Sequence, residues 1–510
     1  MKKFSIYFLL IGVMLQSAIA QQKNVVLIIV DDLKPLINSF GESQMITPNL
    51  DKLASESAVF TNAHCQQAVC APSRVSFMTG MRPDYTKVWD LKTKMRDMNP
   101  DILTMPQYFR QNGYQTIGMG KVLHGARKND KRSWTVPYIE DTDLTYAEGY
   151  RMPANKDYQS EEAQKLYDEL ASKYPGDPNS DKVWLAVNKE MKKMGVRQSM
   201  EAEDVPDDAY ADGAIALESI KQMEKQRKAR NPFFIAIGFH KPHLPFVAPK
   251  KYWDLYNRDE LELASFQEHA AGSPRFAYYT FGELKNYSDI PPNLTPEGAV
   301  QEVKQRELIH GYYAAVSYVD AQIGKVMDYL EKSGLKENST IVLIGDHGWH
   351  LGDHGLWNKH SNFEQATRTP MIILAPGQTK ARQITAPEEL VDVFPTVCDF
   401  SGLKIPNQLQ GVSLKPIVTG EEDRLKDAAL SQYPRGDRMG YALRNDRYRL
   451  VEWHQGGDAQ KGIYNPDQVI AVELYDYEND PLEMKSLAEN SQYSAVITEM
   501  RDALKNIIEQ

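Results

Sequence analysis

Four apolar runs in the chain are each followed at once by a polar, chemically reactive group. The runs occupy residues 24–30, 116–120, 232–239 and 340–345. Their length and hydrophobicity predict buried β-strands. Segments with the apolar spacing of helices lie between them, at residues 48–57, 105–112 and 308–332. This alternation predicts an α/β fold, in which a large, mostly parallel sheet lies between helices.

The polar groups stand at corresponding places, the carboxyl ends of the four predicted strands. They are Asp31-Asp32, Lys121, the run from His240 to His243, and Asp346-His347. Because the carboxyl ends of parallel strands meet at one edge of a sheet, these groups are expected to form one site. A lone Asp or His at a strand end is usually a solvated loop residue, but four groups at four strand ends indicate a function.

Two long stretches interrupt this pattern. Residues 125–206 and 254–305 are polar and show little periodicity. Such stretches are typical of insertions that build the substrate pocket of an α/β enzyme.

The C-terminal part of the chain has a different pattern. A charged stretch near residues 416–426 marks a boundary. Beyond it we predict a hairpin turned at Asn445-Asp446 and a helix over residues 491–509, hence a smaller antiparallel sheet with one helix. The expected division is a catalytic domain over residues 21–418 and a C-terminal subdomain over residues 427–510.

Residues 1–20 have the features of a signal peptide. Two lysines precede a short apolar run, which ends in small residues at Ala18 and Ala20. The run is shorter than the roughly 20 residues that span a bilayer, which argues against a retained membrane anchor. We therefore expect an exported protein, periplasmic or extracellular.

Charge and cysteine content argue against a nucleic-acid partner and against a fold that depends on disulfide bridges. The formal net charge is −10, which argues against nucleic acid as a partner. Export permits disulfides, but Cys65, Cys70 and Cys398 do not make an even set. The fold is therefore not expected to depend on disulfide bridges.

One of the cysteines has unusual neighbours, in the stretch from Gln66 to Gly80. Pro72 suits the first turn of a helix, which places Cys70 at the helix N-terminus with Arg74 about one turn on. A thiolate there is a plausible nucleophile. A cysteine hydrolase would also need a base and an orienting partner, but it would have no use for the carboxylate pair Asp31-Asp32.

The stretch Cys70-Ala71-Pro72-Ser73-Arg74, followed by Thr79-Gly80, resembles the C-x-P-S-R…T-G signature of the type I sulfatases. In that family the cysteine is oxidised after translation to formylglycine. The whole pattern is most similar to the iduronate-2-sulfatase branch of the family. The similarity is carried by residues 66–77, 120–124, 240–246, 346–363 and 431–435.

The resemblance implies an alkaline-phosphatase-like fold, a catalytic centre and a cofactor. It implies Ca²⁺ held by Asp31, Asp32, Asp346, His347 and the formylglycine at Cys70. Lys121, Lys359 and Arg74 would serve the sulfate and the formylglycine. His124 and His243 would act as base and acid, in an assignment that could be exchanged. The hard oxygen ligands favour Ca²⁺.

The resemblance also implies a substrate and a partner. The substrate would be a sulfated glycan, and the 2-O-sulfate of iduronate or of an unsaturated uronate in glycosaminoglycans is the first expectation. Lys241 and Arg435 are candidate cations for the uronate carboxylate. A sulfatase-maturing enzyme would be the protein partner, because Cys70 must be converted.

Three alternatives remain at this point. One is a sulfatase that acts on another sulfated polysaccharide. Another is a phosphatase or phosphodiesterase of the same fold, but such enzymes use Ser or Thr as nucleophile where this chain has Cys70. The third is a non-catalytic glycan-binding protein, which the occupied catalytic positions make the weakest.

Overall fold

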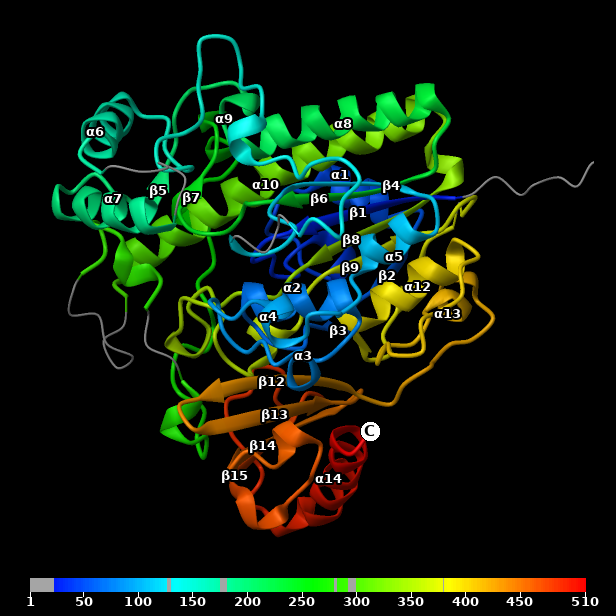
Figure 1. Ribbon diagram of the computed structural model, residues 1–510. Helices are drawn as coiled ribbons and strands as arrows, with labels where there is room; N and C mark the ends of the chain where they lie inside the picture. The colour runs from blue at the N-terminus through cyan, green and yellow to red at the C-terminus, as the bar shows by residue number, and fades with distance from the viewer. Residues whose placement is uncertain (1–22, 126–129, 175–180, 279–281, 292–299, 379) are drawn as a thin grey trace, which may run out of the picture.

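The computed structural model of the protein describes residues 23–125, 130–174, 181–278, 282–291, 300–378 and 380–510 (Figure 1). The predicted signal peptide lies outside these ranges. Within them, no helix is both long and apolar enough to cross a membrane.

A seven-stranded sheet forms the centre of the molecule, in the order β10-β2-β9-β8-β1-β6-β4. Its strands are β1 Asn24–Val30, β2 Ala58–Phe60, β4 Gln115–Gly120, β6 Phe233–Phe239, β8 Ser339–Gly345, β9 Met371–Leu374 and β10 Arg382–Ile384. β9 runs antiparallel to β2 and β8, and the other pairs are parallel. The predicted mixed, mostly parallel sheet is confirmed, and the four predicted strands lie next to one another in it.

Strand β1 shows why the sheet needs helices on both faces. Its seven residues are all buried. Val26, Ile28 and Val30 belong to one hydrophobic cluster, and the alternate residues Val25, Leu27 and Ile29 belong to another. Because successive side chains of a strand point to opposite faces, both faces of the sheet must be covered.

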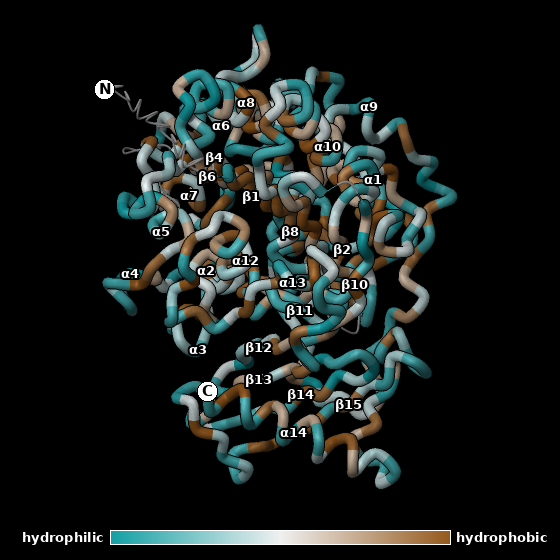
Figure 2. The backbone as a smooth tube through the Cα atoms, turned by 90° about the vertical axis from the view of Figure 1, so that its right-hand side faces the viewer, coloured by the Kyte–Doolittle hydropathy of each residue, from teal (hydrophilic) through white to brown (hydrophobic). Residues whose placement is uncertain are grey.

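The helices supply this cover in two layers (Figure 1). On one face lie α1 Pro48–Ala54, α8 Ala211–Ala229 and α10 Glu302–Lys332; on the other lie α2 Cys70–Thr79, α5 Met105–Gln111 and α12 Val393–Phe400. In Figure 2 the hydrophobic segments gather around β1, β6 and β8, inside a more hydrophilic periphery.

The short elements complete the chain around these layers. They are β3 Ala63–His64, α3 Pro83–Thr86, α4 Met95–Met98, β5 Met200–Glu201, β7 Phe246–Val247, α9 Lys250–Trp253, α11 Glu364–Thr367, β11 Glu388–Glu389 and α13 Lys415–Thr419. β3 pairs with β11, and β5 pairs with β7.

The first insertion contains two helices that the sequence analysis did not predict, α6 Glu161–Ala171 and α7 Asp181–Lys193. The buried residues of α6 are Ala163, Leu166 and Leu170, which have helical spacing. They pack in a separate cluster with aromatic residues such as Trp253 of α9 and Tyr318 of α10. The expectation that this stretch lacks periodicity is therefore wrong.

The C-terminal region forms a second, antiparallel sheet, as predicted. Its strands are β12 Ala429–Arg435, β13 Arg438–Arg444, β14 Tyr448–Gln455 and β15 Val469–Asp476, in that order, and α14 Ser494–Ile508 packs on it. At the predicted turn, Oδ1 of Asn445 accepts hydrogen bonds from the backbone N–H groups of Arg447 (3.0 Å) and Tyr448 (2.6 Å). This Asx turn fixes the hairpin between β13 and β14.

A buried ionic network ties the linker before β12 to β11 and to the turn that follows β11. Lys426 forms ion pairs with Glu389, at 2.8 Å, and with Asp392. Arg82 also pairs with Glu389, at 2.8 Å. Both carboxylates are buried, so they depend on these cations. Burial, together with the charge of Asp392, raises the pKa of the neighbouring Glu388 to about 8.

We expect Lys426→Met to destabilise the protein by about 3–5 kcal/mol, because it leaves two buried carboxylates short of a partner. A lower midpoint of thermal unfolding would show the loss. Lys461→Met is the matched control: the Lys461 side chain is 67 % exposed and its nearest carboxylate oxygen is 3.8 Å away, so this change should cost less than about 0.5 kcal/mol. Equal midpoints for the two variants would contradict the prediction.

Candidate active site

The sheet register brings the predicted polar groups together. Val30 pairs with Phe239 on one side and with Gly345 on the other, so β1, β6 and β8 end at the same level. Asp31, His240 and Asp346 are the residues that follow these strands. On β4, Gly120 pairs with Gly238 of β6, so Lys121 follows at nearly the same level. The four strand ends therefore form one edge, as predicted.

Two glycines permit a close approach of β4 and β6 at this edge. Gly120 has φ of 66°, and a Cβ atom there would lie 2.2 Å from the carbonyl oxygen of Gly238. A Cβ atom on Gly238 would lie 2.2 Å from the carbonyl carbon of Lys121. No side chain fits in either place, so the backbone of Lys121 can rest directly on β6.

Arg74 forms hydrogen bonds with residues from three of the four strand ends. Its side chain is fully buried. Nη2 donates to Asp31 Oδ1 (2.7 Å), and Nε donates to Asp346 Oδ2 (2.9 Å). Nη1 donates to the backbone carbonyls of Lys121 and Val122. One residue of α2 thus fixes the ends of β1, β8 and β4 relative to Cys70, which begins the same helix.

Asp32 adopts a rare backbone conformation, with φ of 59°. Its N–H donates to Asp346 Oδ1 (3.0 Å), and its carbonyl accepts from the hydroxyl of Tyr312 (2.7 Å). Left-handed backbone in a residue other than glycine is unfavourable, so surrounding contacts must maintain it. Tyr312, on α10, is one such contact that the sequence analysis did not identify.

The ionisable groups of the site strongly perturb one another. Burial would raise the pKa of Asp31, but Lys121 and then Arg74 outweigh it, and the pKa falls well below its usual value. For Asp32, burial dominates, and its pKa rises to about 6 despite the nearby Lys359. A site that must hold both carboxylates as anions therefore needs additional positive charge.

The donor atoms fit a divalent cation. Asp31, Cys70, Asp346 and His347 each offer one ligand atom, and these atoms lie within 4.8 Å of one another. Nδ1 of His347 donates to the carbonyl of Gly348 (3.0 Å), which leaves Nε2 to face the carboxylates. Among the described residues Nε2 has no hydrogen-bond partner, and it is buried 3.4 Å from Asp32 and 3.5 Å from Asp346. A cation between these groups would satisfy all of them.

Cys70 itself is buried and belongs to a second group of candidate ligands, with Asp31, Asp32 and His243. Its Sγ stands in for the oxygens that a hydrated formylglycine would present at this position. The predicted nucleophile therefore lies among the predicted metal ligands.

Two predicted lysines and one further acid adjoin these carboxylates. The sequence analysis did not identify the acid, Glu283. Lys121 pairs with Asp31, and Lys359 pairs with Asp32 at 2.9 Å. Lys359 also pairs with Glu283, at 2.9 Å, and His243 Nε2 lies 2.9 Å from the same carboxylate. Glu283 comes from the second insertion, where no motif or periodicity marks it.

Asp212, at the start of α8, shapes the loop that carries His243. Its carboxylate accepts hydrogen bonds from the backbone N–H groups of His240 (2.7 Å) and Lys241 (2.9 Å). The Lys241 ammonium donates to the carbonyls of His243 (3.1 Å) and Pro245 (2.8 Å). Through these contacts the Lys241 side chain stabilises the loop to which it belongs. His124 lies in the segment that follows Lys121 and is half-buried.

Arg435, at the end of β12, is bound to backbone carbonyls. It donates to those of Phe276 (3.0 Å), Ala277 (3.1 Å), Pro434 (3.2 Å) and His360. Carbonyl oxygens hold a guanidinium without neutralising its charge. Arg435 thus joins the second insertion, the segment that follows Lys359 and the C-terminal sheet.

The C-terminal sheet forms hydrogen bonds with the segment that precedes Cys70. In β12, Ser431 Oγ donates to the carbonyl of Cys65 (2.6 Å). The backbone N–H of Gln432, the next residue, donates to the carbonyl of Gln66 (2.8 Å). These two bonds hold the segment that leads into Cys70, so the C-terminal sheet helps to place the start of α2.

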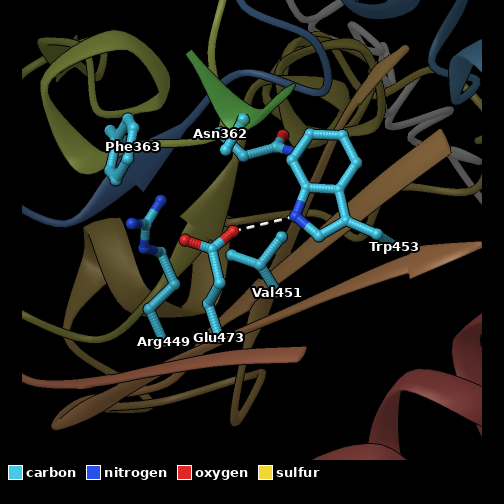
Figure 3. A pocket seen from close by; sticks show the side chains of 7 residues that line it. Asn362, Phe363, Arg449, Val451, Trp453 and Glu473 are labelled. Carbon is cyan, nitrogen blue, oxygen red and sulfur yellow. Dashed lines mark hydrogen bonds between the residues drawn. The ribbon is translucent and has the colours of Figure 1, made fainter. Parts of the chain in front are cut away.

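A small pocket lies between β14, β15 and the segment after Lys359 (Figure 3). It is lined by Ala277, Asn362, Phe363, Arg449, Val451, Trp453 and Glu473. Trp453 Nε1 donates to Glu473 (2.8 Å) across it. None of the predicted catalytic residues lines this pocket, so it is separate from the site at the sheet edge.

Comparison with known proteins agrees with this fold and site. The family model described as "Sulfatase" matches residues 23–403, and one described as "N-sulphoglucosamine sulphohydrolase, C-terminal" matches residues 352–510. The chain belongs to the sulfatase family and is a sulfuric ester hydrolase.

Individual relatives give more detail. The chain is 32 % identical to the iduronate 2-sulfatase of Mus musculus, over 94 % of this chain and 93 % of that protein. A solved structure of a 2-O GAG sulfatase is 20 % identical and has a TM-score of 0.64, over 96 % of this chain and 92 % of that one. The phosphonate monoester hydrolase of Agrobacterium radiobacter is also 20 % identical, with a TM-score of 0.71 and 95 % coverage of both chains. These two structures support the fold alone.

Proposed function

We propose that the protein removes the 2-O-sulfate of iduronate, or of an unsaturated uronate at the non-reducing end of a glycosaminoglycan. The observation that carries the proposal is the similarity to iduronate 2-sulfatase along nearly the whole chain. The cationic groups Lys121, Lys359 and Arg435 suit an anionic sugar sulfate.

The nucleophile and the cation would come from groups added to the chain. Formylglycine formed from Cys70 would supply, as a hydrated aldehyde, an oxygen nucleophile that can later release sulfate. Ca²⁺ held by Asp31, Asp32, Asp346 and His347 would supply positive charge beside the sulfate. We propose export to the periplasm or the exterior, with a sulfatase-maturing enzyme as partner.

The residues of the chain would share the remaining work. Lys121 and Lys359 balance the negative charge that spreads over the sulfate oxygens. The His243 ring lies between two oxygen groups, with Nδ1 2.6 Å from the Leu244 carbonyl and Nε2 2.9 Å from Glu283. We assign His243 as the acid that protonates the leaving oxygen and His124 as the base.

A panel of defined sulfated disaccharides tests the substrate. We expect a preference for 2-O-sulfated uronate over glucosamine 6-sulfate. Arg435→Ala should lower kcat/KM on the uronate by about 1.5–3 kcal/mol and leave an aryl sulfate nearly unchanged. Arg438→Ala is the matched control, because Arg438 faces Arg435 in the β12–β13 pair. A preference for the 6-sulfate, or equal losses on both compounds, would contradict the assignment.

A further inference from the structure

The two insertions meet in a junction that carries three cations. Lys192 lies in the last turn of α7, Arg197 follows that helix, and Lys285 belongs to a single helical turn of the second insertion, Leu284–Asn286. Within the described parts of the chain, none of the three forms an ion pair with a carboxylate. We call Lys192, Arg197 and Lys285 the cationic junction.

The acids that flank the junction along the chain are paired with other cations. These pairs are Glu190 with Lys193 at 2.6 Å, Glu283 with Lys359 at 2.9 Å, and Asp289 with Lys304 at 2.5 Å. The junction therefore keeps an excess of positive charge, although the chain as a whole has a formal net charge of −10. Such a local excess attracts anionic ligands.

Hydrogen bonds to backbone groups hold the junction together. Arg197 Nη1 donates to the Asn286 carbonyl (3.1 Å), and the Ser288 N–H donates to the Arg197 carbonyl (2.7 Å). The Ser288 hydroxyl donates to the Lys192 carbonyl (3.1 Å), and the Lys192 ammonium donates to the Lys285 carbonyl. Carbonyl oxygens hold these cations without neutralising their charge, so the junction is both ordered and positive.

One helical turn connects the junction to the active site. Glu283 immediately precedes this turn, and its carboxylate lies 2.9 Å from Lys359 Nζ. Tyr287 immediately follows the turn, and the Arg197 guanidinium lies over its ring at 4.7 Å. A 3-10 turn rises about 2 Å per residue, so the four steps from Glu283 to Tyr287 cover about 8 Å. The junction therefore begins beside the active site.

The Tyr287 hydroxyl lies within electrostatic reach of both places. Burial raises the pKa of Tyr287 well above its usual value, while Arg197 at the junction and Lys359 in the active site both lower it. Among the described residues, this hydroxyl has no hydrogen-bond partner. It is therefore available to a ligand that extends from Lys359 towards Arg197.

We propose that the cationic junction binds the sugar next to the one that loses its sulfate, through a sulfate or carboxylate group on that neighbouring sugar. Arg197 would make the main contact: its Nε and Nη2 have no acceptor in the described chain, so one edge of the guanidinium fork can bind such a group. Lys192, which is exposed, and Lys285, which is half-buried, add positive charge. The inference rests on the proposed function, because it takes a sulfated glycan as the substrate.

Two disaccharides that differ by one sulfate test this inference. Both carry 2-O-sulfated uronate at the non-reducing end, and only one carries a second sulfate, on the neighbouring glucosamine. We expect Arg197→Gln to raise KM on the doubly sulfated compound by about 10-fold with little change in kcat, because the lost contact binds ground state and transition state alike. KM on the singly sulfated compound, and on 4-nitrophenyl sulfate, should change by less than about 2-fold.

Further variants separate binding from structural damage. Lys285→Gln changes a residue that does not lie over the Tyr287 ring, and it should raise KM on the doubly sulfated compound by about 2–3-fold. Arg197→Lys keeps the charge and should recover part of the loss caused by Arg197→Gln. Lys193→Gln is the matched control: Lys193 already pairs with Glu190, so this change should alter neither KM.

The possible failures can be told apart. For Arg197→Gln and Lys285→Gln, equal changes of KM on the two disaccharides, or no change on either, would overturn the inference and leave the proposed function in place. A wild-type protein that carries formylglycine but hydrolyses neither disaccharide would overturn the proposed function, and this inference with it.

Discussion

Cys70→Ala is expected to reduce turnover of sulfate esters by roughly 10⁴-fold or more, the loss that follows removal of a covalent nucleophile. The structure supplies the physical reason. Cys70 is buried among Asp31, Asp346 and His347, with Arg74 one turn further along the same helix. Cys70 supplies the only thiol in the two candidate ligand groups of the described chain.

Mass spectrometry of the peptide that contains residue 70 makes the prediction specific. Active protein from a host with a sulfatase-maturing enzyme should carry an aldehyde there in place of the thiol. Cys398→Ala is the matched control, because Cys398 is buried in α12 as part of the second hydrophobic cluster and should not affect turnover. Active protein with an intact Cys70 thiol, or a Cys70→Ala variant that keeps its turnover, would contradict the assignment.

Most of the central sheet could be predicted because its signals are local. Each of the runs that became β1, β4, β6 and β8 is a short apolar segment, and in a parallel sheet the residue after each strand necessarily lies at the same edge. Asp31, Lys121, His240 and Asp346 follow this rule. The hairpin at Asn445 could be predicted for a similar reason, since an Asx turn depends on one side chain and its immediate neighbours.

The insertions were harder to predict because their structure depends on distant contacts. The helices α6 and α7 bury only one face each, against a small cluster that includes residues of α9 and α10. Their polar residues therefore outnumber the apolar ones that mark the helical period. Once the buried positions are known, the spacing of Ala163, Leu166 and Leu170 is clear.

Glu283 could not be predicted as part of the active site for the same reason, because its placement depends on distant contacts. Its place in the site follows from contacts with His243 and Lys359, which lie on other segments of the chain. Nothing in the sequence around residue 283 records these contacts. The motif residues could be assigned from resemblance, whereas the acid that bridges two of them is apparent only from the folded arrangement.

Asp346→Asn is expected to abolish most of the activity and to weaken cation binding. Asp346 accepts from Arg74 and from the backbone of Asp32, and it lies 3.5 Å from His347 Nε2. Asparagine keeps the shape but removes one of three carboxylate charges. It also removes one of the two carboxylates that pair with the buried Arg74, the other being Asp31. Both effects favour loss of the cation and of the geometry around Cys70.

Thermal unfolding with and without Ca²⁺ measures this effect independently of activity. At about 100 times its dissociation constant, a bound ion stabilises the folded protein by about 2.7 kcal/mol. The wild type should therefore unfold at a higher temperature with Ca²⁺ than after chelation, and Asp346→Asn should lose most of that difference. Asp328→Asn is the control, because Asp328 lies on the exposed surface of α10 and should keep the full difference. Stoichiometric zinc in the active protein would contradict the choice of Ca²⁺, since three carboxylates and one histidine are harder ligands than zinc sites usually offer.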